Sequence, residues 1–405
     1  MEIFRNTNFD FLGKKWPFII ASLVLTVAGL ASIGLKGGLR YGIDFKGGAL
    51  MTVKFAGPPP VDKIRAALSK KIPGEVSVQT FTDLSGGNEV VIGTELAGER
   101  ELNADRRAMQ ETLEANFGQG SGGKLDLNNV GQQAVVERLR DPLQRAGVQL
   151  SDQQLQTLAA DVLRVRDTPP QSGLLTNYEQ LSKVPGMTPS ILNTLKQETY
   201  LAPFSIRQVE MVGPKVGAEL RRKAILATLY ALGGMLVYIA FRFEWIYGVA
   251  AVIAVFHDTV ITVGLFSLFN KEISLTVIAA LLTLVGYSMN DTIVIFDRIR
   301  ENLKLTRREP LEVTINKSVN QTLSRTIMTS GLTFLTVIAL FLFGGPVLHG
   351  FSFALVVGII IGTYSSVFIA SPIVLFWHNF VEGRRKTSPA LAPAKEPVRR
   401  TKAVK

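Results

Sequence analysis

Residues 281–296 form an apolar run, long enough to belong to a membrane-spanning helix, that contains Asn290 and Asp291. A carboxylate at the centre of such a helix costs roughly 2.5–3.5 kcal/mol on insertion scales. The charged sequence that begins at Asp297 lies about 9 Å further along, at about 1.5 Å per residue, so Asp291 is in the hydrocarbon region. Groups that cost this much usually have a task, and proton transfer is chemistry that a membrane carboxylate can perform.

Arg325 begins a polar stripe on a second apolar segment, and Thr329, Thr333 and Thr336 follow it at helical spacing. We interpret Arg325 as a counter-charge to Asp291. Burial favours the neutral acid and a nearby cation favours the carboxylate, so a group held between these effects can change its protonation with solvent access. The alternative is structural: Arg325 reaches the cytoplasmic interface and the threonines pack between helices.

Three further polar residues are secondary candidates. Asn290 and Thr292 flank Asp291 and are expected to orient the carboxylate or its water. Asp258 follows His257 in the middle of another apolar segment, and the pair is either part of a proton path or a structural polar cluster. Adjacent residues on a helix point about 100° apart, so the two cannot face one narrow site equally.

The segments that must position these residues are bunched apolar runs. Hydrophobic residues make up 47% of the 405-residue chain and charged residues only 19%. This composition predicts a polytopic α-helical membrane protein with six transmembrane helices. The first is interpreted as an uncleaved anchor. The predicted spans are residues 18–35, 224–241, 246–269, 274–296, 327–343 and 351–377.

The net charge of +11 is distributed in a way that favours a lipid bilayer and not nucleic acid as the partner. Basic residues gather on one side of a six-span chain, whereas the opposite short loops hold only Lys271. By the positive-inside rule, both termini are cytoplasmic. The basic residues are Lys14, Lys15, Arg242, those of 298–308, and the tail residues Arg384, Arg385, Lys386, Arg399, Arg400, Lys402 and Lys405.

Several chemistries lack the residues they need. The chain has no cysteine and three scattered histidines, which gives no pattern for a metal site. No grouping of serine, histidine and aspartate indicates covalent catalysis, and no glycine-rich phosphate loop is present. We therefore predict no enzyme activity, no cofactor and no metal.

A polar region, residues 36–223, separates the first two spans and is predicted to be a periplasmic α+β domain. Its strand and helix patterns follow the order of a ferredoxin-like unit, with a helical insertion at about residues 123–203. The strands are expected at 49–55, 75–80, 89–93 and 205–212, and the helices at 62–71 and 99–117. The remaining divisions are residues 1–16, 17–35, 224–377 and 378–405, namely the cytoplasmic N-terminus, the first helix, helices two to six and a basic cytoplasmic tail.

A glycine-rich segment, residues 42–48, connects the first helix to this domain. Gly42, Gly47 and Gly48 permit a tight turn as the chain leaves the membrane, and Asp44 can cap or hold the turn. The favoured role of this segment is a structural joint between the helix and the outer domain, and the alternative is that it transmits motion.

These motifs together resemble the SecF family of bacterial Sec translocase subunits, within the RND superfamily. They extend from before the polar domain to the last helix, whereas the interval 123–203 is longer than is usual in the family. The matching stretches are Gly42-Ile-Asp-Phe-Lys-Gly-Gly48, Val212-Gly-Pro-Lys-Val-Gly217, Phe256-His-Asp258, Gly286-Tyr-Ser-Met-Asn-Asp-Thr-Ile-Val-Ile-Phe-Asp-Arg-Ile-Arg-Glu301, Gln321-Thr-Leu-Ser-Arg-Thr326 and Gly362-Thr-Tyr-Ser-Ser366.

The resemblance implies an RND-like subunit of the bacterial inner membrane. It implies a heterodimer with SecD that uses the proton-motive force to drive late steps of preprotein export through SecYEG. SecA and YajC or YidC are further implied partners, and the family's proton-relay residues fall on Asp291 and Arg325. Two alternatives remain open: half of an RND-like proton-coupled small-molecule transporter, and a non-catalytic subunit for translocon assembly.

Overall fold

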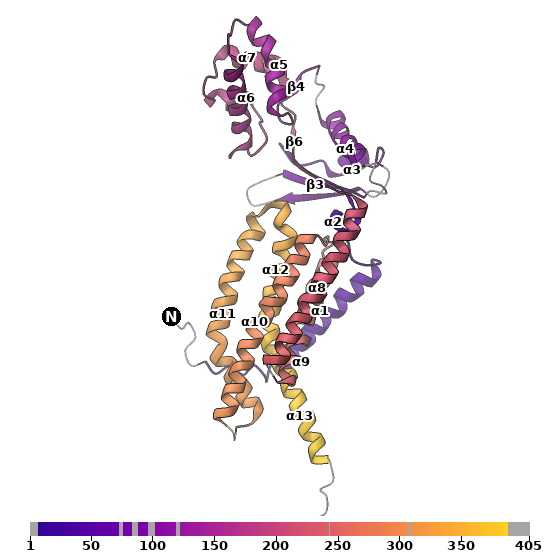
Figure 1. Cartoon of the computed structure of the whole chain (residues 1–405), viewed down its shortest axis with the longest axis vertical. Coiled ribbons are helices and arrows are strands. Elements are labelled where there is room, and N and C mark those ends of the chain that lie inside the picture. The colour runs from indigo at the N-terminus through magenta and orange to yellow at the C-terminus, as the bar shows by residue number, and fades with distance from the viewer. Residues whose placement is uncertain are drawn as a thin grey trace, which may run out of the picture.

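The computed structural model describes residues 7–72, 76–82, 88–95, 102–118, 122–242, 244–306 and 309–387. A bundle of long helices lies at one end, a β-sheet covers the end of the bundle, and a helical subdomain lies beyond the sheet (Figure 1). The first six residues and the tail from residue 388 onward, including Arg399, Arg400, Lys402 and Lys405, lie outside the described residues.

Six helices in the described part of the chain are long and apolar enough to cross a membrane, which confirms the predicted number. The last span continues from α12 through a π-helical segment, η3, into α13. Several helices exceed the apolar runs because polar turns extend them beyond the hydrocarbon: α8 begins at Pro214 and α11 at Leu311. The bounds are α1 Lys15–Leu35, α8 Pro214–Arg242, α9 Trp245–Leu268, α10 Leu275–Leu305, α11 Leu311–Phe343, α12 Gly345–Ser365, η3 Ser366–Ala370 and α13 Ser371–Thr387.

The helices α9, α10 and α12–η3–α13 form the interior of the bundle. Half or more of the most apolar stretch of each of these spans is buried, against 11–17% for α1, α8 and α11. Two glycines allow a close crossing of α1 and α9, because a Cβ on Gly29 of α1 would lie 2.7 Å from the Cα of Gly264 on α9. The peripheral helices therefore keep wide faces open to lipid or to another protein.

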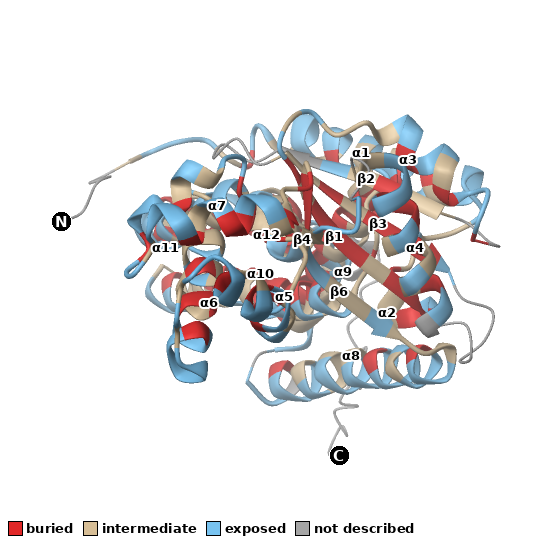
Figure 2. Ribbon diagram, turned by 90° about the horizontal axis from the view of Figure 1, so that it is seen from above, coloured by how far each residue is buried: buried red, intermediate tan, exposed pale blue. Residues whose placement is uncertain are grey.

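The sheet has the predicted ferredoxin-like topology. Its four antiparallel strands lie in the order β2-β3-β1-β6, and two helices cover one face. Alternate residues of β1, such as Met51 and Val53, pack with Ile92 and Phe204 under these helices, where the buried strands are red in Figure 2. The elements are β1 Gly48–Phe55, α3 Val61–Leu68, β2 Val76–Thr82, β3 Asn88–Glu95, α4 Leu102–Phe117 and β6 Phe204–Val212.

The predicted helical insertion between α4 and β6 has its own apolar core, built around residues such as Leu139, Val162 and Leu195. Asn128 ties it together through hydrogen bonds with the backbones of Leu175 and Ala202. The insertion also contains a short pair of parallel strands that the sequence did not predict. The elements are β4 Leu125–Asp126, α5 Gln132–Arg145, α6 Asp152–Asp167, the 3-10 helix η2 Tyr178–Lys183, α7 Pro189–Glu198 and β5 Thr199–Tyr200.

Candidate functional site in the membrane bundle

Asp291 lies on the inward face of α10 and is only 3% exposed. It is sixteen residues beyond Leu275, so it sits about 24 Å from the sheet end of the helix at about 1.5 Å per residue. Its Oδ2 accepts a hydrogen bond of 3.0 Å from the hydroxyl of Ser330 on α11, which is also buried. A buried carboxylate that meets a neutral donor can exist in either protonation state without breaking an ion pair.

Arg325 is exposed on α11 and forms no salt bridge with Asp291 or with another described residue. Its charge nevertheless acts on Asp291 from outside hydrogen-bonding distance. The threonines that follow Arg325 bond to their own helix: Thr329 donates to the carbonyl of Arg325, and Thr333 donates to that of Thr329. The stripe thus leaves the guanidinium available on an open face of the bundle.

Asn290 and Thr292, the two sequence neighbours of Asp291, differ in burial. Thr292 is fully buried and donates a 3.1 Å hydrogen bond to the carbonyl oxygen of Ser288, one turn earlier on α10. Asn290 is exposed and forms no side-chain hydrogen bond within the described ranges, so it does not touch the carboxylate. The structure therefore brings Thr292, but not Asn290, into the polar interior.

Asp258 on α9 is 1% exposed and contacts α10 at Ser288, three residues before Asp291. Its Oδ2 accepts hydrogen bonds from Ser288 of α10 at 2.5 Å and from Ser365 of α12 at 2.7 Å. Its Oδ1 lies 2.9 Å from Nδ1 of the adjacent His257. Both members of the pair thus enter one polar cluster, although adjacent helix residues diverge.

The glycine-rich joint packs against the start of α8 through the short helix α2 (Ile43–Lys46) and the two glycines that follow it. Gly47 has a φ of +83°, and a Cβ there would lie 2.6 Å from the Cα of Pro214. Asp44 accepts a 2.8 Å hydrogen bond from the backbone N–H of Leu275, so it caps the first turn of α10. One segment therefore contacts the sheet, α8 and the helix that carries Asp291.

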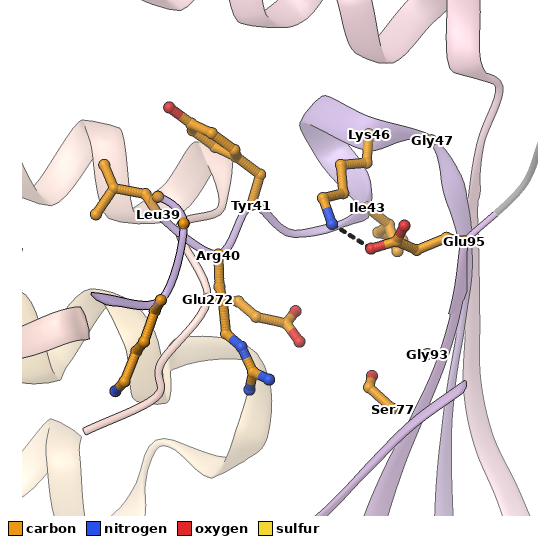
Figure 3. A pocket seen from close by; sticks show the side chains of 13 residues that line it. Leu39, Arg40, Tyr41, Ile43, Lys46, Gly47, Ser77, Gly93, Glu95 and Glu272 are labelled. Carbon is orange, nitrogen blue, oxygen red and sulfur yellow. Dashed lines mark hydrogen bonds and ion pairs between the residues drawn. The ribbon is translucent and has the colours of Figure 1, made fainter. Parts of the chain in front are cut away.

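A cavity of about 480 Å³ lies between this joint, the loop before α10 and the polar face of the sheet (Figure 3). Arg40 and Glu272 line one side, and Lys46 pairs with Glu95 on the other. Glu272 accepts a 3.0 Å hydrogen bond from Gln79 of β2, which links the sheet to the α9–α10 loop. Burial raises the pKa of Glu272, against the smaller opposing effects of the Arg40 and Lys46 charges.

Ser330, Ser288 and Ser365 are site residues that the sequence reasoning missed. Serine is common in membrane helices as a packing residue, so an isolated serine gives little signal. Their place in a motif is the one sequence feature that points to a role. Ser365 and Ser366 end the motif of residues 362–366, where α12 passes into the π-helical segment η3.

Comparison with known proteins decides the family. The model for the C-terminal region of the protein export membrane proteins SecD/SecF matches residues 192–380, and the SecD/SecF GG motif matches residues 34–59. The protein translocase subunit SecF of Koribacter versatilis is 50% identical over 404 residues, which is 97% of each chain. The chain belongs to the SecF family. SecF of Calditerrivibrio nitroreducens is 37% identical and covers 92% of this chain.

The fold comparison agrees with this family. The crystal structure of SecDF from Thermus thermophilus, a translocon-associated membrane protein, matches with a TM-score of 0.62 and 32% identity. The match covers 92% of this chain and 39% of the SecDF chain. The resemblance inferred from the motifs is therefore confirmed, as is a multi-pass membrane protein of RND-like architecture.

Proposed function

We propose that this chain is the SecF half of a SecD–SecF heterodimer that uses the proton-motive force to drive late steps of preprotein export through SecYEG. Its relatives are protein translocase subunits, and Asp291 lies buried where a proton-driven subunit needs a protonatable group. In this proposal SecA acts on the preprotein before this step, and YajC or YidC joins the assembly. The chain lies in the bacterial inner membrane with both termini cytoplasmic.

The exposed face of α11 supports a SecD partner. It carries Arg325 and Thr329 within a membrane span, and lipid tails cannot solvate a guanidinium. A second subunit, or water held by one, is the environment that this face needs. In Thermus thermophilus the SecD and SecF parts form one chain, SecDF, which this chain matches over 39% of its length.

Protonation of Asp291 is the proposed trigger. One proton crossing 100 mV releases roughly 2.3 kcal/mol, and each pH unit of gradient adds about 1.4 kcal/mol. Reversing a two-state equilibrium from 1:99 to 99:1 needs about 5.5 kcal/mol. One proton at such a gradient biases a conformational change without completing it. Loss of charge on Asp291 weakens its attraction to Arg325 and frees α10 to shift against α11.

The joint provides a route from the trigger to the α+β domain. A shift of α10 acts at its first turn on Asp44, which holds the N–H of Leu275. Asp44 belongs to α2, and Gly47 and Gly48 connect α2 directly to β1. Movement of α10 would therefore tilt the sheet and the helical insertion beyond it, on the periplasmic side, where the preprotein emerges.

The observation that carries this proposal is the buried Asp291 with a neutral donor. Its test is proton-driven export into inverted membrane vesicles from cells that carry Asp291→Asn together with native SecD. We expect loss of the proton-driven component and partial retention in Asp291→Glu. Asp297→Asn is the matched control, because this exposed residue lies on the same helix and pairs only loosely with Arg242 at 3.7 Å.

Two outcomes would overturn the proposal. Full proton-driven export in Asp291→Asn would show that protonation of Asp291 is not the trigger. Normal export in the double variant Asp291→Asn, Arg325→Ala would instead support a subunit that only stabilises the translocon.

A further inference from the structure

A second polar cluster surrounds Asp258 of α9, which contacts α10 at Ser288, three residues before Asp291. Two hydroxyl donors, Ser288 of α10 and Ser365 of α12, and a ring nitrogen of the adjacent His257 of α9 approach the Asp258 carboxylate from three helices. Gly362 permits the close approach of α12, since a Cβ there would lie 3.1 Å from the Cβ of Ser288. The cluster is thus built into the packing of the bundle.

Only one of the two ring nitrogens of His257 has a hydrogen-bond partner in this cluster. Nδ1 faces Asp258 at 2.9 Å, whereas Nε2 is buried and has no hydrogen-bond partner within the described ranges. The ring stands edge-on to Tyr364, with centroids 6.3 Å apart, and the Tyr364 hydroxyl bonds to Ser22 of α1 at 2.7 Å. In the neutral tautomer that donates from Nδ1 to the carboxylate, Nε2 carries a free lone pair.

No cation other than the His257 ring pairs with Asp258 among the described residues. His257 is the only described salt-bridge partner of Asp258, and no described lysine or arginine lies within 4 Å of it. The groups that face the pair from the packed helices are the hydroxyls of Ser288 and Ser365 and the ring of Tyr364. An ionised Asp258 beside a neutral ring is an uncompensated buried charge, whereas a proton on Nε2 creates a neutral ion pair.

The cluster also contacts the helix that carries the proposed trigger. Ser288 is one turn before Thr292, and Thr292 donates to its carbonyl, so Ser288 lies beside Asp291 on α10. Ser365 immediately precedes the π-helical segment Ser366–Ala370, and π segments often occur at functional sites. Helix α10 is therefore bonded to α9 through Ser288 and Asp258, and to α11 through Asp291 and Ser330.

We propose that His257 and Asp258 form a second proton-binding site in the bundle, with the proton accepted at His257 Nε2 and its charge balanced by Asp258. The role of this site depends on the proposed function, because the site adds a second proton-binding group to the trigger at Asp291. The two sites act on α10 through different neighbouring helices, α9 and α11, so their loading sets the position of α10 relative to both.

The test is ¹⁵N-histidine NMR of the full chain in lipid nanodiscs. The chain has three histidines, so three ring signals are expected, and His257→Asn identifies the relevant one. If that variant does not fold, His349→Asn and His378→Asn identify it by elimination. We expect a neutral ring protonated on Nδ1 that becomes doubly protonated between about pH 5 and 8. In Asp258→Asn the ring should bind this proton less tightly, because the carboxylate that balances its charge is removed.

A ring that keeps one protonation state throughout this range, or a neutral ring protonated on Nε2, would overturn the second site. The measurement needs no export. In Asp291→Asn the His257 signal should still titrate, even though that variant is expected to lose proton-driven export. Failure of the second site is thereby distinguishable from failure of the proposed function.

Discussion

Ser330 of α11 donates a 3.0 Å hydrogen bond to the buried carboxyl of Asp291 on α10, and no ion pair joins Asp291 to Arg325. The sequence placed Arg325 as the partner because both residues are charged in apolar segments. The structure instead places a neutral hydroxyl in direct contact and the arginine at a longer range, where its charge still acts on the carboxyl. A hydroxyl accommodates either protonation state of Asp291, whereas a close ion pair would hold it ionised.

Ser330→Ala is therefore expected to affect both stability and export. Removal of the donor leaves a buried carboxyl oxygen unsatisfied, which costs about 1–3 kcal/mol in the free energy of unfolding. Thermal unfolding in detergent and proton-driven export in vesicles measure the two effects. Thr329→Val is the matched control, because the Thr329 hydroxyl bonds to the carbonyl of Arg325 in its own helix. Equal results for the two variants would contradict a role for Ser330.

Arg325→Ala should lose proton-driven export while it remains folded. Arg325 is exposed and has no salt bridge to a described residue, so its truncation is expected to change the free energy of unfolding by less than about 0.5 kcal/mol. Arg325→Lys keeps the positive charge and should retain part of the activity. The comparison with Lys317→Ala, another basic residue of α11, separates the position of the charge from its sign. Equal export by Arg325→Ala and Lys317→Ala would exclude a specific counter-charge.

The sequence predicted the elements of the fold well because their signals are local. Strand-like alternation with β-branched residues identified β1, and long apolar runs identified the six spans. The ends of the helices were less predictable. Helix α8 begins at Pro214, ten residues before the predicted span, because its first turns are polar and show no apolar pattern. The location of Asp291 within the membrane followed from its distance along the helix to the charged sequence that begins at Asp297.

The partners of the charged residues were not predictable, because they depend on which helices pack together. Ser330 and Ser365 come from α11 and α12, and nothing in their local sequence points to Asp291 or Asp258. Asp44 was expected to hold its own turn, yet its carboxylate reaches across to the N–H of Leu275. Such contacts between residues far apart in the sequence appear only once the bundle is assembled.

Gly47→Ala should destabilise the joint. An alanine at a φ of +83° costs about 1–2 kcal/mol, and its Cβ would also lie 2.6 Å from the Cα of Pro214. Gly57→Ala is the control, since a Cβ at Gly57 meets no atom within 4 Å. Limited proteolysis should cut the Gly47→Ala variant faster between the sheet and the bundle. Equal cleavage of both variants would show that the joint tolerates a side chain at Gly47.

Glu272→Gln should flatten the dependence of stability on pH at the sheet–bundle junction. Burial raises the pKa of Glu272 above the ordinary value of 4.5, with Arg40 and Lys46 opposing and Glu95 adding to the shift. The folded chain therefore binds the proton more tightly than the unfolded chain. The free energy of unfolding must fall as pH rises from 4.5 through the raised value, because the folded carboxyl then ionises while buried.

Glutamine keeps an oxygen that accepts from Gln79 and cannot ionise, so the Glu272→Gln variant should lose this fall and be the more stable protein above the window. Thermal unfolding of the full chain between about pH 4 and pH 8 measures the difference, and the variant Glu111→Gln on the exposed face of α4 controls for removal of one surface carboxyl. A profile for Glu272→Gln that runs parallel to the wild type would show that Glu272 keeps one protonation state across the range. Because Gln79 belongs to β2 and Glu272 adjoins α10, a difference confined to this window would show that the contact between the sheet and α10 is sensitive to pH.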